Sequence, residues 1–408
     1  MTQILKLAAI LLLLGSLLSA ATKKKTAAGK SRRTVASSAR KAPAVKKSPV
    51  SKKAVAPKRT RSQVRARTKR APVRYRRARY YNPWKEPTYA DSTVGDSVDG
   101  EDLVVRRAAV EALGPLNGTV VAVDAGTGRI LTIVNQKVAL KGGYTPCSTV
   151  KVFVGMAALS EGVIERDTPV RLTRRFSLNM TEALARSDNP YFAKMGQQLG
   201  FDRVSYYAKM MGLGERAALN LDNEVPGTLP AAPPPDGVGM MSSFGHGIFL
   251  SPLQLASAMA TIANGGTLYY LQYPQSQEEI EGFVPRVKRH LEVQRVLDEL
   301  KPGLMAAVDH GTARRAGYQA DLPILGKTGT CTDRATPTHL GWFGSFSDTE
   351  KNKLAVVVLL TGGKPINGPV ASGVAGKIYK SLDDQGYFEK ERPISPVALV
   401  GTRPCCVD

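Results

Sequence analysis

One long segment near the N-terminus cannot contribute to a folded core. Residues 21–81 contain 23 Lys and Arg residues and no Asp or Glu, and Ala, Pro, Ser and Val make up most of the rest. Such a segment buries too little apolar surface to offset the conformational entropy that folding removes. We therefore predict a disordered basic linker over residues 22–100, a folded domain over residues 101–390 and a C-terminal tail over residues 391–408.

The first residues indicate export from the cytoplasm. Leu7–Leu18 is an almost unbroken apolar run, and Ser19–Ala21 supplies the small residues that a signal peptidase requires. The run is shorter than the roughly 20 residues of a typical membrane-spanning helix. Residues 1–21 are therefore predicted to be a signal peptide or an uncleaved anchor in the inner membrane. Both alternatives place the rest of the chain in the periplasm, or otherwise outside the cytoplasm.

The strong positive charge of the chain belongs to the linker. The formal net charge is +23, yet the 34 basic residues outside residues 21–81 are matched by 34 acidic residues. The linker is similar in composition to a histone tail, which is compatible with nucleic-acid binding. Because an export signal precedes it, we instead predict contact with the inner membrane or an anionic wall polymer, and we do not expect a nucleic acid partner.

Predicted strands lie at both ends of the folded domain, and helices lie between them. Residues 119–123 and 129–134 are predicted strands on either side of a glycine-containing turn, which is typical of a hairpin. Three more strands are expected near the C-terminus, before a last helix, at residues 324–331, 340–346 and 354–360. This order predicts an α+β fold in which both ends of the domain build one antiparallel sheet and a helical lobe is inserted between them.

Ser148 and Lys151 form the first candidate catalytic pair. Side chains three residues apart on a helix lie on the same face, and Ser148 follows Pro146 at the predicted helix start, where unpaired N–H groups favour negative charge. Lys151 is surrounded by apolar residues, so burial is expected to lower its pKa and let the neutral amine accept the Ser148 proton. The pair predicts a serine nucleophile that needs no histidine. A capping serine beside a structural lysine is the alternative interpretation.

Two further motifs follow in the chain. Ser187–Asn189 lies between two predicted helices, and Lys327–Thr330 lies in a predicted strand. The order S-x-x-K, S-D-N and K-T-G is shared by penicillin-binding proteins and class A β-lactamases. A lone S-x-x-K arises by chance in a chain of this length, whereas three motifs in order on the expected elements are specific.

The chain therefore resembles the transpeptidase domain of penicillin-binding proteins over about residues 118–385. Further similar segments are Gly245–Gly247, Ser251–Ala256, Ile262–Gly266, His310–Ala313 and His339–Phe343. The resemblance implies a β-lactamase/transpeptidase-like fold with a five-stranded antiparallel sheet flanked by helices. It also implies an acyl-enzyme that acts on the D-Ala-D-Ala ends of peptidoglycan stem peptides and binds β-lactam antibiotics covalently. No cofactor and no metal are expected.

The resemblance implies a role for each motif residue. Ser148 is the expected nucleophile and Lys151 its general base, while Ser187 is expected to relay protons to the leaving group. Asn189 is expected to form a hydrogen bond with the substrate amide. Lys327 is expected to place positive charge beside Ser187 and the substrate carboxylate.

The K-T-G motif is also expected to bind substrate through Thr328, Gly329 and Thr330. The two threonine hydroxyls would hold the terminal carboxylate. The backbone N–H groups of Ser148 and Thr330 would form the oxyanion hole, in which one donor is typically worth a few kcal/mol of barrier.

Cys147 and Cys331 depart from the family pattern, in which glycine usually precedes the nucleophile. They stand beside Ser148 and Thr330 in the sequence. Some class A β-lactamases that hydrolyse carbapenems have a disulfide at the two equivalent positions. The resemblance therefore implies a Cys147–Cys331 disulfide in an oxidising compartment, and two free, buried thiols are the alternative. The sequence gives no role to Cys405–Cys406.

Two other functions share these motifs. A β-lactamase would need a glutamate for deacylation, and Glu224 lies 37 residues after Ser187, near the class A separation. Its surroundings, Asn223–Pro230, are more similar to a segment of the transpeptidase family. A penicillin-sensing or wall-binding module with little turnover is the second alternative, although the intact motif residues argue against it. The sequence does not distinguish a transpeptidase from a carboxypeptidase, because that depends on whether an acceptor amine or water attacks the acyl-enzyme.

Overall fold

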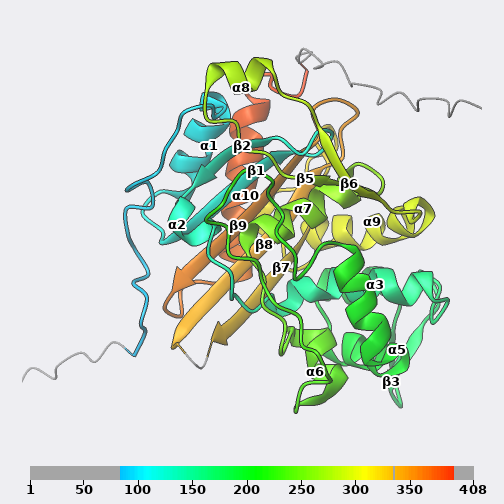
Figure 1. Cartoon of the computed structure of the whole chain (residues 1–408). Coiled ribbons are helices and arrows are strands. Elements are labelled where there is room, and N and C mark those ends of the chain that lie inside the picture. Colours follow the sequence, from blue (N-terminus) through cyan, green and yellow to red (C-terminus); the bar gives the residue numbers. More distant parts are fainter. Residues whose placement is uncertain (1–82, 334–335, 390–408) are drawn as a thin grey trace, which may run out of the picture. The chain divides into compact units, whose positions relative to one another are not determined.

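The computed structural model describes residues 83–333 and 336–389 (Figure 1). The predicted export segment at residues 1–21, the linker up to residue 82, and the C-terminal tail with Cys405–Cys406 lie outside the described residues. In the part of the chain that is described, no helix combines the length and the apolarity needed to cross a membrane.

A five-stranded antiparallel sheet lies at the centre of the domain, with strand order β2-β1-β9-β8-β7. Both ends of the domain contribute to it, because β1 pairs directly with β9 along its whole length. This arrangement confirms the predicted sheet, and it leaves β7, which carries the K-T-G motif, at an edge. The strands are β1 (Gly118–Asp124), β2 (Ile130–Val134), β7 (Ile324–Asp333), β8 (Thr338–Ser347) and β9 (Leu354–Gly362).

Alternate residues of the strands face two different hydrophobic cores. Val120 and Phe343 pack on one face against α1 (Leu103–Leu113) and α10 (Gly368–Asp383). Their neighbours in the sequence, including Trp342, pack on the other face. The helices on that second face include α3 (Lys151–Ser160), α5 (Asn189–Met210), α7 (Pro252–Ala263) and α9 (Gln294–Asp309). The period of two along each strand places one helical layer on each side of the sheet.

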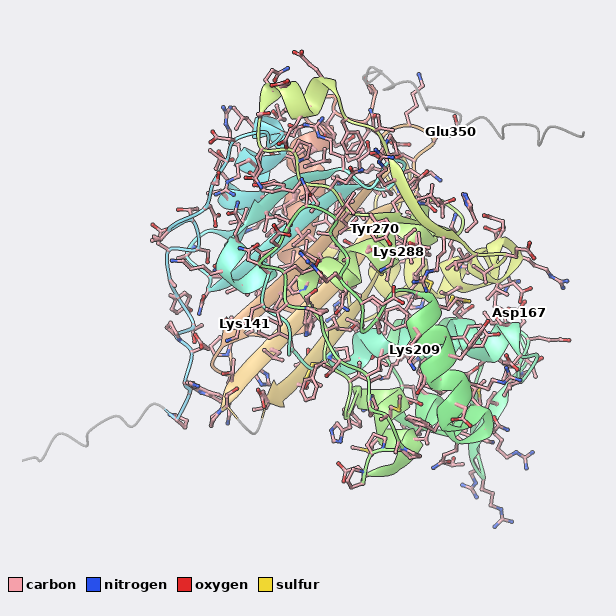
Figure 2. All side chains as sticks on the ribbon, viewed as in Figure 1. Lys141, Asp167, Lys209, Tyr270, Lys288 and Glu350 are labelled. Carbon is pink, nitrogen blue, oxygen red and sulfur yellow. A yellow bond between two sulfur atoms is a disulfide. The ribbon has the colours of Figure 1, made fainter. Side chains whose placement is uncertain are left out.

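A helical lobe follows β2 in the sequence and lies beside the sheet (Figure 1). It is built around α4 (Met180–Arg186), α5, α6 (Gly237–Phe244) and a small hairpin of β3 (Val170–Thr173) and β4 (Phe176–Leu178). The remaining elements are α2 (Gln136–Ala139), the 3₁₀ turns η1 (Cys147–Val150) and η2 (Arg314–Ala316), α8 (Gln277–Glu281), β5 (Thr267–Tyr270) and β6 (Arg286–His290). In the β5–β6 hairpin, Lys288 Nζ lies 5.2 Å from the centre of the Tyr270 ring, and both residues are labelled in Figure 2.

The folded domain begins earlier than the sequence predicted. Residues 83–100, which we assigned to the linker, cross the ends of the sheet strands and continue into α1; we call residues 83–101 the N-terminal strap. The Lys85 N–H donates to the Pro337 carbonyl beside β8, and the Ala90 N–H donates to the Pro115 carbonyl before β1. The strap is thus part of the domain, and the linker prediction was wrong for these residues.

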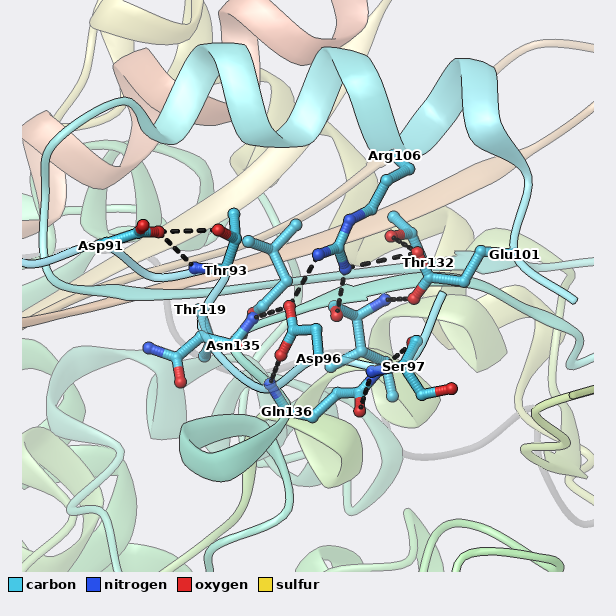
Figure 3. A network of polar contacts seen from close by, with 12 residues as sticks. Asp91, Thr93, Asp96, Ser97, Glu101, Arg106, Thr119, Thr132, Asn135 and Gln136 are labelled. Carbon is cyan, nitrogen blue, oxygen red and sulfur yellow. Dashed lines mark hydrogen bonds and ion pairs between the residues drawn. The ribbon is translucent and has the colours of Figure 1, made fainter. Parts of the chain in front are cut away.

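A buried ion network holds the end of the strap (Figure 3). The Arg106 guanidinium of α1 lies 2.8 Å from the Asp96 carboxylate and 3.3 Å from Glu101, and it donates to the Ile133 carbonyl at 2.8 Å. Glu101 also accepts a 2.6 Å hydrogen bond from the Tyr273 hydroxyl. The two carboxylates are 2% and 0% exposed. Local composition could not predict the strap, because its partners lie in α1, β2 and the segment after β5.

Candidate active site

Ser148 lies in η1, immediately before α3. Two hydrogen bonds fix the loop that leads to it: Trp342 Nε1 donates to the Thr145 carbonyl at 3.0 Å, and Thr149 Oγ1 donates to the Pro146 carbonyl at 2.8 Å. The predicted helix over residues 148–161 therefore begins with a 3₁₀ turn and continues as α3. The serine is half-buried at the N-terminal end of this helical segment, as the sequence predicted.

Lys151 connects the first two motifs. Its Nζ donates to Ser148 Oγ at 3.0 Å, to Ser187 Oγ at 3.1 Å and to the Ser187 carbonyl at 2.7 Å. A further short hydrogen bond joins Nζ to Asn189 Oδ1. The side chain is fully buried, and Nζ lies 5.7 Å from the centre of the Phe192 ring. One amine thus contacts both serine hydroxyls.

The environment of Lys151 favours its neutral form. Burial lowers the pKa of Lys151 from 10.5 to about 7, and the charge of Asp188 opposes this shift only in part. The four oxygen atoms bonded to Nζ belong to hydroxyl, carbonyl and amide groups, none of which is ionised. A substantial fraction of neutral amine therefore exists near pH 7 and can accept a proton from Ser148.

Backbone geometry at the S-D-N motif directs its side chains. Ser187 ends α4 with a left-handed backbone, φ +56°, and Asn189 begins α5. The intervening Asp188 caps α5, because its Oδ1 accepts a 2.8 Å hydrogen bond from the Tyr191 N–H. The Asp188 carboxylate is thus engaged by the helix N-terminus, while the Ser187 and Asn189 side chains turn to Lys151.

Lys327 of β7 is fully buried, and its Nζ donates to the Thr328 carbonyl at 3.1 Å. Burial, together with the neighbouring charge of Lys151, holds the pKa of Lys327 well below its usual value. Among the hydrogen bonds of the described residues, none joins Lys327 to Ser187, so the placement of its positive charge beside Ser187 stays a prediction. The structure places Lys327 close enough to Lys151 for their charges to interact.

The rest of the K-T-G motif lies between the nucleophile turn and α10. A side chain at Gly329 would approach the Pro146 carbonyl to 2.8 Å, so glycine allows β7 to lie against η1. Thr328 is buried and donates to Thr312 Oγ1 at 2.7 Å. Thr330 is exposed, and its Oγ1 accepts a 2.8 Å hydrogen bond from the Gly368 N–H. The Thr330 hydroxyl proton therefore remains available to an incoming anion.

A disulfide joins Cys147 and Cys331, with their Cα atoms 5.6 Å apart. Because these cysteines adjoin Ser148 and Thr330, the bond fixes the two proposed oxyanion donors to one another. Cys147 has a left-handed backbone, φ +54°, a conformation that glycine adopts at little cost. This explains physically why glycine suits the position in the family, and why a cysteine there needs support from the surrounding structure.

Sequence reasoning did not identify Thr312, Phe192 or Gly368 as neighbours of the site. Thr312 lies in the segment 310–313 whose similarity to the family was noted, which was a usable signal. Its N–H donates to the Ala185 carbonyl at 3.0 Å, so this segment supports the end of α4. The other two neighbours arise from the packing of α5 and α10, for which the sequence carries no motif.

Two further candidates make structural contacts. The buried Glu224 carboxylate accepts hydrogen bonds from the N–H groups of Ala217 and Ala218 at 2.9 and 2.8 Å. The His246 side chain is partly exposed, and its Nδ1 lies 2.9 Å from Asp236. Glu224 is therefore occupied by its own loop, which disfavours the deacylating role considered above.

Residues 118–382 match the family model described as the penicillin binding protein transpeptidase domain. The chain belongs to this family. It is 26% identical over 302 residues to stage V sporulation protein D of Bacillus subtilis, a match that covers 64% of this chain and 46% of that protein. It is 24% identical over 357 residues to peptidoglycan D,D-transpeptidase MrdA of Haemophilus influenzae, covering 67% of this chain and 54% of that protein.

Solved structures show the same fold. PBP2 of Pseudomonas aeruginosa in complex with WCK 5153 matches with a TM-score of 0.59 and 23% identity, over 70% of this chain and 74% of that one. The apo transpeptidase domain of penicillin-binding protein 3 from Burkholderia pseudomallei matches with a TM-score of 0.60 and 18% identity, over 71% and 96%. The chain spans about half the length of the first two curated relatives.

Proposed function

We propose that this penicillin-binding domain is a serine D,D-transpeptidase that acts on the D-Ala-D-Ala ends of peptidoglycan stem peptides through an acyl-enzyme on Ser148. The observation that supports it most strongly is the buried Lys151 amine, which contacts the hydroxyls of both Ser148 and Ser187 and has a pKa of about 7. Such an amine provides a general base without histidine. Release to water, as in a carboxypeptidase, uses the same acyl-enzyme.

In the acylation step, Ser148 Oγ attacks the carbonyl carbon of the penultimate D-Ala while its proton moves to Lys151 Nζ. The oxyanion of the tetrahedral intermediate accepts hydrogen bonds from the N–H groups of Ser148 and Thr330. The peptide C–N bond then breaks, and the Lys151 proton passes through the Ser187 hydroxyl to the leaving D-Ala amine. In transfer, the amine of a second stem peptide attacks the ester carbonyl, the bond to Ser148 Oγ breaks, and the proton lost by the amine returns to Ser148 Oγ through Lys151.

The terminal carboxylate of the substrate is assigned to the K-T-G motif. Thr328 and Thr330 supply hydroxyls, Gly329 keeps the strand close to η1, and Asn189 is assigned to the substrate amide. Burial and the neighbouring charge of Lys151 lower the pKa of Lys327 in the free enzyme. An arriving carboxylate would oppose this shift, because a nearby negative charge favours the charged form of the Lys327 amine.

The export segment, the periplasmic location and the contact of the basic tail with the inner membrane or an anionic wall polymer are further parts of the proposal. The Cys147–Cys331 disulfide supports an oxidising compartment, and the 23 basic residues of the linker suit an anionic surface. A fusion to a reporter enzyme that is active only in the periplasm tests the location, and an expressed fusion without reporter activity would contradict it.

Labelling with fluorescent penicillin tests the proposed chemistry. We expect a stable adduct on Ser148 that is absent from the Ser148→Ala variant. Loss of the label within seconds would identify a β-lactamase instead, which the occupied Glu224 carboxylate disfavours. Absence of any label on folded protein would support a binding module without turnover. A pentapeptide substrate, with and without an acceptor amine, then separates transfer from hydrolysis.

A further inference from the structure

The β3–β4 hairpin carries a charged and aromatic tip with no role in the proposed chemistry. Val170 and Leu178 face each other across the two strands and are buried in the lobe core, so they fix the base of the hairpin. Toward the tip, every residue of 173–177 is exposed, and Phe176 retains 42% of its surface in solvent. Figure 1 shows β3 at the end of the lobe that lies away from the five-stranded sheet. The tip is therefore accessible to a large partner.

The turn of the hairpin consists of two exposed arginines. Thr173 pairs with Phe176, which leaves Arg174 and Arg175 as a two-residue loop. Glycine, asparagine and aspartate are the residues preferred in such loops, because they adopt left-handed backbones easily. Neither Arg174 nor Arg175 has a left-handed backbone, so this turn does not require those residues. The turn therefore tolerates two exposed arginines at the end of the hairpin.

The charge of the tip is not compensated. Arg171, Arg174 and Arg175 are all exposed. The acidic residue that precedes them most closely, Asp167, is bound by Arg166 at 2.7 Å. Within the described ranges, no carboxylate forms an ion pair with any of the three hairpin arginines. The guanidinium groups are thus free to bind phosphate groups, which they match with paired hydrogen bonds.

We propose that the β3–β4 tip is a peripheral membrane contact that binds anionic phospholipid headgroups through its arginines and places Phe176 in the headgroup–acyl boundary. Basic residues around an exposed aromatic ring suit that boundary, where the ring loses water and the cations remain hydrated. An anionic wall polymer would also attract the arginines, but it offers less to the phenyl ring. The contact is independent of the proposed peptidoglycan chemistry.

The test places a reporter at the tip of the full-length protein. In Phe176→Trp, tryptophan emission is recorded on vesicles of phosphatidylethanolamine and phosphatidylglycerol, with the unsubstituted protein as the blank for Trp84 and Trp342. We expect a blue shift, together with quenching by bromine-labelled lipid, and neither effect on phosphatidylcholine vesicles. Because the signal is local, binding of the basic linker to the same vesicles does not produce it.

Charge reversal gives the matched control. Arg174→Glu with Arg175→Glu, in the Phe176→Trp background, is expected to weaken the emission response about tenfold or more. Arg107→Glu with Lys377→Glu changes the net charge equally at exposed positions of α1 and α10 and should leave the response intact. Thermal melts show that each variant is folded. If the Phe176→Trp protein sediments with the vesicles while the emission of its added indole stays unshifted, the proposal is overturned. A shift produced by peptidoglycan fragments but not by vesicles would overturn it as well.

Discussion

Two of the buried basic side chains of this domain, Arg106 and Lys151, have different surroundings. Arg106 is bonded to two carboxylates, Asp96 and Glu101, at the junction of the strap and α1. Lys151 is bonded to four uncharged oxygen atoms of Ser148, Ser187 and Asn189. Carboxylates compensate the burial of a guanidinium charge, whereas neutral acceptors leave the burial of an ammonium largely uncompensated, so burial lowers its pKa.

The two buried basic side chains have different roles. The Arg106 network holds the strap to α1 and β2 through ion pairs and a backbone hydrogen bond. The Lys151 cluster holds an amine that can gain or lose a proton near pH 7. A buried cation is therefore reactive or structural according to the charge of its partners, and four changes test this difference.

Lys151→Arg should have the largest effect. The guanidinium stays protonated at any pH that the protein survives, so it cannot serve as a general base. We expect the acylation rate to fall about 10⁴-fold, measured by stopped-flow labelling with a fluorescent β-lactam. A rate within tenfold of the original would remove Lys151 from the mechanism. An unchanged circular dichroism spectrum provides the control for folding.

Arg106→Met should lower the stability of the fold without changing the acylation rate. It leaves two buried carboxylates without their cation, which costs about 3–5 kcal/mol of unfolding free energy. Urea denaturation measures the loss, and the acylation rate of the folded fraction should stay unchanged. Arg107→Met is the matched control, since this exposed neighbour should change stability by less than about 0.5 kcal/mol. Equal effects of the two changes would refute the assigned role of the network.

Removal of the disulfide tests whether acylation depends on the covalent link between the segments that carry Ser148 and Thr330. Replacing both Cys147 and Cys331 by alanine should lower the unfolding free energy by about 2–4 kcal/mol. Acylation should also slow, because the N–H groups of Ser148 and Thr330 are no longer tied together. A variant with Cys405 and Cys406 replaced by serine controls for loss of thiols. If acylation by the alanine variant is as fast as in this control, the disulfide has no part in the site.

Asn189→Asp should give Lys151 a carboxylate partner, as Arg106 has. A carboxylate beside Lys151 favours the ammonium and raises its pKa by about 1–3 units. The midpoint of the acylation pH profile should rise accordingly, and the rate at pH 7 should fall about 10–100-fold. The diagnostic quantity is the midpoint, which Asn189→Ala should shift far less. A slower enzyme with an unmoved midpoint would indicate lost substrate contacts alone.

Much of the fold could be predicted because its elements are regular in sequence. Alternating strands and capped helices indicated a sheet built from both ends, and the structure confirms it. The contacts of the strap could not be predicted, because Asp96 and Glu101 are bonded to residues that are distant along the chain. The return of acidic residues from Glu86 onward was the signal that the basic linker had ended.

The candidate site divides in the same way. Motif spacing indicated Ser148 and Lys151, since positions i and i+3 share one face of a helix. Ser187 was indicated by its position between two predicted helices. The deep burial of Lys327 was not foreseen, because it follows from how β7 packs beneath the nucleophile turn. The ring of Phe192 beside the Lys151 amine was likewise set by tertiary packing.

The pH dependence of acylation tests the central claim most directly. Since burial depresses the pKa of Lys151 to about 7, the neutral base forms as the pH rises, so acylation of Ser148 should accelerate through about pH 7 and then level off. Single-turnover labelling at a series of pH values would show this midpoint, which should be lost in Lys151→Arg. A rate that is flat across this range, or that rises only near the ordinary lysine pKa of 10.5, would contradict the account.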